Sequence, residues 1–521
     1  MPYRSYILAS LFLYLLTSTI GFMNKTAYLS VYDKTGIVDF ARGLEGLGFE
    51  IYASGSTYKL LKESEIDAEE IRYSPPVPVS VLKALSGLPA VLSENGVEVP
   101  KLYVVAANLY PIANITGQEE FAIEELSNYL DQANASVLRA AARDFENVIT
   151  LCRPEDYLIV LEKLKAVGGL EPEHKRQLSA KAWQYMAAYD ATVAQYLSET
   201  RDLLGEEVVM SLKKVSNLAY GENRHQKAAF YALSGARPRG LNAARILSGG
   251  QFNLNHYLDL DTAFELAAEF EEPVCVISKH AKPAGVCSAA KPLDCFRGAL
   301  KADPAGAAGG TAAFNRQIDP DTARALTEAF IESVVAPDYS GEALILLRAK
   351  EGLRVVTLPP PVLSPHEVEL YAVAGGILIE SKDQAVLGQE LQCVTRRKPS
   401  DEELRSLKLA WKTAKYAKTY AVVLASGGTS VSVSAAESST YDALCSAAQK
   451  LKNKHPIFEG KAPLVMACDA ALPLSTLEAA LMTGVSAVIQ PGGWREDLLC
   501  AQFCDLKNAA MLLTGIRHFR H

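Results

Sequence analysis

Hydrophobic residues along the chain alternate between short β-branched runs and stretches with helical spacing. Residues 28–32 form the first apolar run, and Ile37, Phe40 and Leu44 follow at the spacing of one helix face. Further strands are predicted at 49–53, 102–107 and 148–152, with helices near 121–130, 157–166 and 175–199. This alternation predicts an α/β fold in which helices cover both faces of a parallel sheet.

The second half of the chain carries a basic pair after an apolar run. Val274 to Ile277 is β-branched, and Pro283 with Gly285 is expected to end the strand. Lys279 and His280 are therefore expected at the carboxyl end of a strand, where α/β proteins gather their sites. The neighbouring like charge favours neutral imidazole, which can accept a proton. The pair indicates a general base with its tuning group, and a solvated basic turn remains the alternative.

Small polar residues follow the first two predicted strands. Asp33-Lys34-Thr35-Gly36 and Ser54-Gly55-Ser56-Thr57 each lead into a helix. Free backbone N–H groups at such turns favour an anion, so the two turns could form a phosphate cradle. Ser/Gly turns also cap helices in any α/β protein, and the sequence leaves both readings open.

Four other stretches attract attention by composition. Residues 217–226 are densely polar, and residues 514–521 end the chain on a cationic aromatic cluster. The glycine-rich stretch 303–316 has too little bulk for a core and is expected to approach another group closely. Residues 426–439 read as a Gly/Ser-rich loop, and no internal repeat is evident.

Composition excludes several classes of protein. The chain has 521 residues, 49% of them hydrophobic and 21% charged, which is enough for two to four soluble domains. A net charge of −8 argues against sequence-independent nucleic-acid binding. Nine cysteines are scattered without a CxxC pair or zinc-ligand spacing, so we expect reduced core cysteines in a cytosolic protein.

Residues 1–22 differ in character from the rest of the chain, which is expected to be cytosolic. Residues 6–22 resemble a signal-peptide core and are too short for a membrane span. An apolar strand begins directly after Met23-Asn24-Lys25, so we expect residues 1–22 to be a mis-assigned start. Secretion is the alternative, against which the unpatterned cysteines count.

Nine stretches, in chain order, resemble a known family. They read VYDKTGIVDFARGLEGLGFEIYASGST, NLYP, LRAAARD, YGENRHQ, KHAKPAG, GGTAAFNR, VVAPDYSGEAL, VIQPGG and TGIRHFRH. In this order they are similar to the bifunctional purine biosynthesis enzymes, which couple AICAR transformylase to IMP cyclohydrolase. The similarity extends from Met23 to His521.

The resemblance implies a domain plan and two reactions. Residues 23–205 would form a methylglyoxal-synthase-like parallel-sheet domain that closes the ring of formyl-AICAR to give IMP. Residues 206–521 would form a cytidine-deaminase-like α/β region that moves a formyl group from 10-formyltetrahydrofolate to AICAR. The family leads us to expect a cytoplasmic homodimer that binds these nucleotides, requires no metal, and binds neither nucleic acid nor membrane.

Site residues are implied by the same motifs. Catalytic roles fall on Lys279, His280 and Asp469 in the transformylase part and on Lys83, Tyr110, Asp131 and Arg143 in the cyclohydrolase part. Substrate-binding roles fall on Ser30, Lys34, Ser54, Gly55, Thr57, Asn108, Tyr220, His225, Gly309, Gly310, Arg517 and Phe519. A neutral His280, helped by Lys279, would take the proton that the AICAR amine loses as it attacks the formyl carbon.

Several motif positions depart from the family pattern. Ala219 stands in place of a nucleotide-binding arginine, and Thr419-Tyr420 in place of a Ser-Asn pair. Asp131-Gln132-Ala133-Asn134 replaces Asp-Ile-Gly-Gly, so side chains project where backbone would approach the nucleotide. Arg143 replaces a lysine, and Lys83 is the one cation of its segment that can be placed. We favour a working enzyme in which the motifs support formyl transfer better than ring closure. The alternative is a degenerate homologue that binds nucleotide, folate or a partner without one or both activities.

Overall fold

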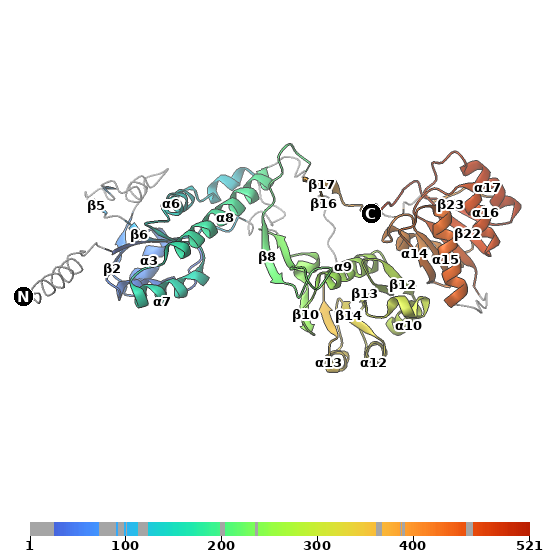
Figure 1. Cartoon of the computed structure of the whole chain (residues 1–521), viewed down its shortest axis with the longest axis horizontal. Coiled ribbons are helices and arrows are strands. Elements are labelled where there is room, and N and C mark those ends of the chain that lie inside the picture. Colours follow the sequence, from blue (N-terminus) through green and yellow to red (C-terminus); the bar gives the residue numbers. More distant parts are fainter. Residues whose placement is uncertain are drawn as a thin grey trace, which may run out of the picture. The chain divides into compact units, whose positions relative to one another are not determined.

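The computed structural model describes residues 25–71, 90–91, 98–99, 102–112, 123–197, 204–234, 238–360, 367–385, 387, 391–454 and 462–521. The chain divides into two compact units (Figure 1). The amino-terminal unit comprises Met1–Lys213 with Leu233–Arg237, and the carboxyl-terminal unit comprises Lys214–Ala232 with Pro238–His521. Among the described residues, no helix combines the length and apolar character needed to cross a membrane. Residues 1–22 and Lys83 lie outside the described residues.

A five-stranded sheet in the order β3-β2-β1-β6-β7 forms the centre of the amino-terminal unit. Its strands are β1 (Lys25–Ser30), β2 (Phe49–Ala53), β3 (Glu69–Glu70), β6 (Leu102–Ala107) and β7 (Ile149–Leu151). All neighbouring pairs are parallel, which confirms the predicted parallel sheet. Parallel strands end at the same edge, so the residues that follow β1, β2 and β6 meet there. A separate pair, β4 (Ala90–Val91) and β5 (Glu98–Val99), lies outside this sheet.

Helices cover both faces of the parallel sheet, as Figure 1 shows. One face packs against α2 (Ile37–Glu45), α3 (Gly55–Glu63) and α7 (Tyr157–Val167). The other face packs against α6 (Gln132–Arg143) and α8 (Pro172–Leu197). Two short 3₁₀ segments, Ile123–Tyr129 and Pro154–Asp156, precede α6 and α7. The helix expected near residues 121–130 is the first of these segments.

A twelve-stranded mixed sheet organises the carboxyl-terminal unit, in the order β10-β15-β14-β13-β11-β12-β20-β19-β21-β22-β23-β18. The strands are β10 (Arg245–Ser248), β11 (Val274–Ser278), β12 (Pro283–Ser288), β13 (Gly310–Phe314), β14 (Ile331–Ala336), β15 (Arg354–Thr357), β18 (Gln392–Cys393), β19 (Val422–Ser426), β20 (Thr429–Ser434), β21 (Leu464–Cys468), β22 (Val485–Gln490) and β23 (Ala510–Leu513). Two ribbons stand apart from the sheet, β8 (Leu212–Asn217) with β9 (Ala229–Leu233) and β16 (Val368–Val373) with β17 (Gly376–Ser381).

The sheet contains one arrangement twice, although no internal repeat is evident in the sequence. In each copy a helix precedes an antiparallel hairpin, whose first strand pairs with the first of three parallel strands. The first repeat contains α9 (Leu254–Ala268), β11, β12, α10 (Pro292–Ala302), α11 (Pro304–Ala307), β13, α12 (Pro320–Glu328), β14, α13 (Gly341–Ala349) and β15. The second contains α14 (Asp401–Lys415), β19, β20, α15 (Thr440–Lys454), β21, α16 (Leu474–Met482), β22, α17 (Asp497–Leu506) and β23.

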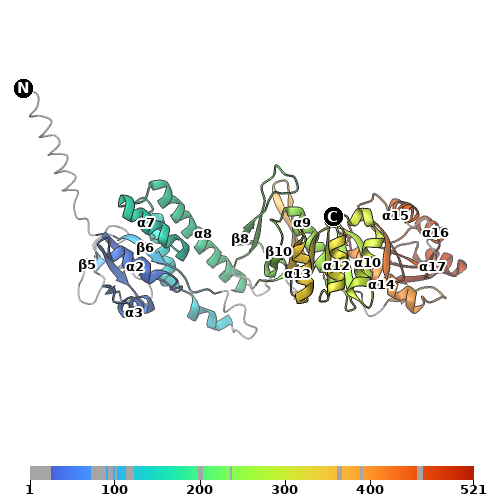
Figure 2. The same ribbon diagram turned by 90° about the horizontal axis from the view of Figure 1, so that it is seen from below.

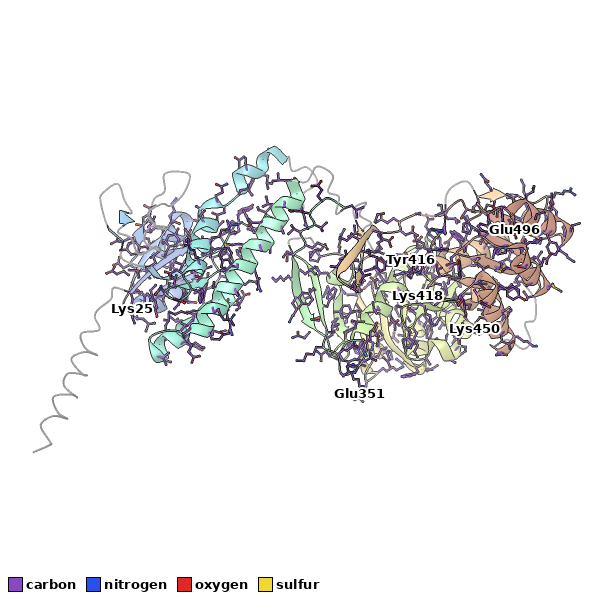
Figure 3. All side chains as sticks on the ribbon, turned by 45° about the horizontal axis from the view of Figure 1, so that its top comes forward. Lys25, Glu351, Tyr416, Lys418, Lys450 and Glu496 are labelled. Atoms are coloured by element: carbon purple, nitrogen blue, oxygen red, sulfur yellow. The ribbon has the colours of Figure 1, made fainter. Side chains whose placement is uncertain are left out.

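The two repeats share one core. Helices α9 and α14 bury Leu260, Phe264, Leu407 and Trp411 in a single apolar cluster against one face of the sheet. The remaining helices of each repeat form two separate clusters with the opposite face. Figure 2 shows helices α9, α10 and α12 to α17 from below, and in Figure 3 Tyr416 and Lys418 mark the segment between α14 and β19.

Two expectations are wrong, because the glycine-rich stretch 303–316 and the expected loop 426–439 both contribute buried strands to the sheet. The glycine-rich stretch contains β13, where Ala312, Ala313 and Phe314 are at most 2% exposed. The serine-rich stretch contains β20, which buries Ser430 and Ser434 completely. Small and hydroxylated side chains fill these core positions because helices pack closely over them and the serine hydroxyls find hydrogen-bond partners.

Candidate functional site

Hydroxyl groups gather at the carboxyl edge of the amino-terminal sheet. Ser30 ends β1, and Ser54 follows β2. The Ser54 hydroxyl donates to Ser30 Oγ at 2.7 Å and lies 3.2 Å from the hydroxyl of Tyr28. Burial raises the pKa of Tyr28 to about 12, so Tyr28 stays a neutral hydroxyl. Both serines thus sit in a fixed, buried network.

A lysine and a helix terminus adjoin these hydroxyls. Lys34 Nζ donates to Thr57 Oγ1 at 3.0 Å and to the Val31 carbonyl oxygen. Burial lowers the pKa of Lys34, although Asp33 opposes this. Helix α3 begins at Gly55, and its N-cap residue makes no side-chain capping bond. A cation beside free helix N–H groups is an arrangement that binds phosphate.

Asn108 connects the third strand end to this edge. Its Oδ1 accepts the backbone N–H groups of Tyr32 at 2.6 Å and Asp33 at 2.9 Å. Its carbonyl oxygen accepts from Asn134 Nδ2 at 3.4 Å. The turn after β1, which contains Lys34, is therefore held by β6.

Asp131 caps α6 and is contacted by Asn134. Its Oδ1 accepts the Asn134 backbone N–H at 3.0 Å, and its Oδ2 accepts from Asn134 Nδ2 at 2.9 Å. Burial raises the pKa of Asp131, while the hydrogen bonds from Asn134 partly lower it. The Asn134 side chain therefore occupies one carboxylate oxygen of Asp131.

The other expected cyclohydrolase residues are distributed differently. The Tyr110 ring contacts Tyr32 and Tyr129, with centroids 4.7 and 5.4 Å apart. Desolvation and these neighbouring tyrosines raise the pKa of Tyr110. Arg143 is the last residue of α6, an exposed position at the opposite end from Asp131. A helix of this length separates its two ends by about 16 Å.

The basic pair occupies the turn of the β11–β12 hairpin. Strand β11 ends at Ser278 as expected, but Pro283 begins an antiparallel strand instead of stopping the sheet. The Lys279 backbone N–H donates to the Lys282 carbonyl oxygen at 3.0 Å, and His280 is exposed. Lys279 Nζ donates to the Ala308 carbonyl oxygen.

Two glycines lie near Lys279, Gly310 where a side chain would clash and Gly309 where the backbone is left-handed. A Cβ on Gly310 would meet the Ser278 carbonyl oxygen at 2.6 Å. Gly309 has a φ of 74°, and a Cβ there would lie 3.5 Å from both Lys279 Nζ and Glu332 Oε1. Gly309, Lys279 and Glu332 therefore form one small polar region.

Tyr220 joins this region through the start of α9. Its hydroxyl accepts from Asn253 Nδ2 at 2.7 Å. The Asn253 backbone N–H donates to His256 Nδ1 at 3.0 Å, so Nε2 carries the proton and donates to Glu332 Oε2 at 3.0 Å. His225 lies in the exposed loop that follows Tyr220.

Asp469 is fully buried in the second repeat. It accepts from the Thr419 hydroxyl at 2.6 Å and from the Ala421 backbone N–H at 2.9 Å, and burial raises its pKa. Asn315 occupies the equivalent position in the first repeat, where its side-chain oxygen accepts the Val274 backbone N–H at 3.0 Å. Strands β12, β20 and β19 lie between β11 and β21, so the fold does not place Asp469 beside the basic pair.

The cationic end of the chain packs against Tyr420, the residue after the Thr419 that contacts Asp469. The Arg517 guanidinium lies 4.1 Å from the Phe519 ring centroid, and Phe519 meets Tyr420 edge-on at 5.6 Å. A cavity of about 270 Å³ is lined by Arg517, Phe519 and Arg520 together with charged residues of β17 and α14. Tyr420 therefore supports the aromatic ring over which the cation lies.

Sequence reasoning missed three residues of the basic region. Asp259, His256 and Glu332 contact the hairpin turn or each other, but they come from α9 and β14. The sequence offered no local signal for them, apart from Asn253 before a helix, which is typical of an N-cap. Among the described residues, no group of three histidine, cysteine, aspartate or glutamate side chains is arranged to hold a metal ion.

Comparison with known proteins identifies the relatives of the chain. The family model for the AICARFT/IMPCHase bienzyme matches residues 141–450, and the MGS-like domain model matches residues 36–127. The bifunctional purine biosynthesis protein PurH of Persephonella marina is 36% identical over 523 residues, covering 96% of this chain and 100% of the relative. PurH of Caldicellulosiruptor saccharolyticus is 34% identical over 522 residues with the same coverage.

Other proteins of the same description are similar to the chain over a comparable length. PurH of Bacillus subtilis (strain 168) is 35% identical over 517 residues, covering 95% of this chain and 99% of the relative. The crystal structure of ForH is 31% identical and covers 34% of this chain and 99% of that chain, at a TM-score of 0.28 that is too low to support a statement on the fold. The likeness to the PurH proteins spans almost the whole sequence, so the chain belongs to the AICARFT/IMPCHase bienzyme family.

Proposed function

We propose that this enzyme transfers a formyl group from 10-formyltetrahydrofolate to AICAR and then closes formyl-AICAR to IMP. The observation that carries the proposal is the likeness to bifunctional purine biosynthesis proteins along nearly the full length of the chain. We assign ring closure to residues 23–205 and formyl transfer to residues 206–521. The division into two compact units close to this boundary supports the assignment.

Formyl transfer requires a base beside the AICAR amine. The amine nitrogen attacks the formyl carbon, the bond from that carbon to the folate nitrogen breaks, and one proton passes from the amine to the folate nitrogen. His280 is exposed at its turn, where it can accept the proton from the amine and then donate it to the folate nitrogen. We assign Lys279, Gly309, Gly310, Tyr220 and His225 to the same site, and Arg517 with Phe519 to the nucleotide. The cation–ring pair at the chain end supports the last assignment.

Ring closure joins the carboxamide nitrogen to the formyl carbon and releases water. Lys34, Ser54, Thr57 and the start of α3 would hold the nucleotide phosphate. Asp131 would accept the carboxamide proton, and we assign Tyr110 to the same reaction. This part of the proposal also includes Ser30, Gly55, Asn108, Lys83 and Arg143, which match or replace family positions.

We further propose a cytoplasmic homodimer that uses folate as cosubstrate. All nine cysteines are free, which fits a reducing compartment. The β16–β17 ribbon exposes Leu370, Val373, Ile377 and Leu378, an apolar group that a second copy could cover. Sedimentation equilibrium should give twice the mass of the chain, and a monomer at micromolar concentration would contradict this.

Two observations favour a second candidate, in which ring closure is lost and the amino-terminal site only binds nucleotide. Asn134 occupies an oxygen of Asp131, and Arg143 lies at the far end of α6. Under this reading formyl-AICAR would accumulate without IMP.

The purified chain, given AICAR and 10-formyltetrahydrofolate, tests both candidates. Release of tetrahydrofolate reports formyl transfer, and appearance of IMP reports ring closure. We expect both, and we expect His280→Ala to abolish the first. His174→Ala, in α8, is the matched control and should leave formyl transfer unchanged. Formyl transfer that survives His280→Ala would refute the role of His280.

A further inference from the structure

The two repeats use the same hairpin in different ways. In the second repeat the two central turn residues are Gly427 and Gly428, with φ of 55° and 74°. In the first repeat the equivalent residues are His280 and Ala281, with φ of 57° and 55°. Glycine adopts these left-handed angles freely, whereas a residue with a Cβ does so only at a cost. The turn with the histidine therefore holds a disfavoured conformation that its counterpart avoids.

A side chain from the preceding helix contacts each turn at the same place. Asp259 and Ser406 are each the sixth residue of a fifteen-residue helix, α9 and α14. Asp259 Oδ1 accepts the Ala281 backbone N–H at 2.7 Å, and Ser406 Oγ accepts the Gly428 N–H at 3.3 Å, both across 22 residues. The first repeat thus combines the strained turn with a shorter bond to a stronger acceptor.

Other equivalent positions show that this match is not accidental. Asn253 and Ser400 both form capping boxes at the starts of α9 and α14. The third residue of each helix, His256 or Glu403, contacts the second residue of a strand, Glu332 in β14 or Ser486 in β22. The helix–turn bond therefore belongs to a framework that both repeats share. The acceptor of this bond is a carboxylate in the repeat that carries His280 and a hydroxyl in the other repeat.

The Asp259 carboxylate is buried at some cost. It is 6% exposed, and burial raises its pKa to about 6, with the Ala281 N–H partly opposing this rise. The Lys279 amino group donates to the Ala308 carbonyl oxygen, so Asp259 is the side chain that holds the turn backbone. A buried carboxylate with a short bond to a strained backbone N–H is a device that holds geometry.

We propose that Asp259 is a positioning residue for formyl transfer, which fixes the left-handed turn and so directs the His280 side chain toward the substrate. It acts through the backbone and touches no reacting atom. The inference rests on the proposed function for its effect on catalysis, while its effect on the turn is independent of that function.

The test compares Asp259→Ala, Asp259→Asn and the control Ser406→Ala in the full chain. Asp259→Ala should lower kcat for formyl transfer roughly 10- to 100-fold and change KM for AICAR less than twofold, because a small misplacement of a catalytic group costs about that much. Asp259→Asn keeps an acceptor oxygen and should restore kcat to within about threefold of the unaltered enzyme. Ser406→Ala, next to a Gly-Gly turn that needs no support, should leave kcat unchanged.

A second measurement separates the turn from the chemistry. Hydrogen exchange of the Ala281 amide should accelerate at least tenfold in Asp259→Ala and stay slow in Asp259→Asn. Adding Ala281→Gly to Asp259→Ala should recover at least threefold in kcat, because glycine adopts the turn unaided. Unchanged exchange in Asp259→Ala, or equal kcat in Asp259→Ala and the unaltered enzyme, would overturn the proposal. Inactivity of the unaltered enzyme would refute the proposed function, and the exchange experiment would still decide the role of Asp259.

Discussion

The hydrogen bond from Asn134 to Asp131 predicts the pH at which ring closure loses activity on the acidic side of its pH profile. Asn134→Ala removes the 2.9 Å bond to Oδ2 and keeps the backbone N–H bond to Oδ1. Burial raises the pKa of Asp131 and the lost bond had lowered it, so the pKa must rise further in the variant. A hydrogen bond to a charged group contributes roughly 1.5–3 kcal/mol, which corresponds to about one to two pKa units.

The assay is the pH dependence of IMP formation from formyl-AICAR. If Asp131 acts as a carboxylate, the acidic limb in Asn134→Ala should move up by roughly one to two units. The ¹³C shift of the Asp131 carboxyl carbon, followed by NMR, should report the same change without turnover. Asn147→Ala is the matched control, because Asn147 donates to Asp144 at 2.7 Å in an exposed pair of the same spacing. A limb that moves equally in both variants, or an unmoved carboxyl titration in Asn134→Ala, would refute the reasoning.

Three other predictions concern binding, acid stability and packing. Lys34→Ala should raise KM for formyl-AICAR about 10- to 100-fold with a smaller change in kcat, since a phosphate contact is made equally in ground and transition states, and equal loss in kcat would contradict this. Burial raises the pKa of Glu403, but bonds from Arg397, Ser486 and Ser400 outweigh it and lower the pKa from 4.5 to about 2. This contributes up to about 3 kcal/mol of stability above pH 4.5 that is lost as pH falls toward 2, so urea unfolding of Glu403→Gln should depend less on pH between 5 and 3. Gly310→Ala should destabilise by about 2 kcal/mol or more because of its 2.6 Å clash, whereas Gly341→Ala, with nothing within 4 Å, should not.

The parallel sheet could be predicted because its signals are local. Strands β1 and β2 are each an apolar run followed by a turn and an amphipathic helix. Strand β20 could not, because alternating serines are typical of a loop until their partners are known. Ser430 Oγ accepts the N–H of Val286, 144 residues away, and no local pattern records that distance.

The candidate site divides in the same way. Lys279 and His280 were visible because they end an apolar run, and β11 does end just before them. Asp259 and Glu332 were not, because one lies within a helix and the other within a strand, and each reaches the site through tertiary contacts. Their roles, like that of Asp469, depend on which strands the sheet places side by side.

The common core of α9 and α14 determines how the carboxyl-terminal unit can be dissected. A fragment that ended before α14 would leave Phe264 and Leu260 without Trp411 and Leu407, and would expose a large apolar surface. Such a fragment should aggregate or pair with another copy instead of folding alone. We therefore expect the two repeats to unfold as one cooperative block, and we expect a substitution at Trp411 to destabilise both of them.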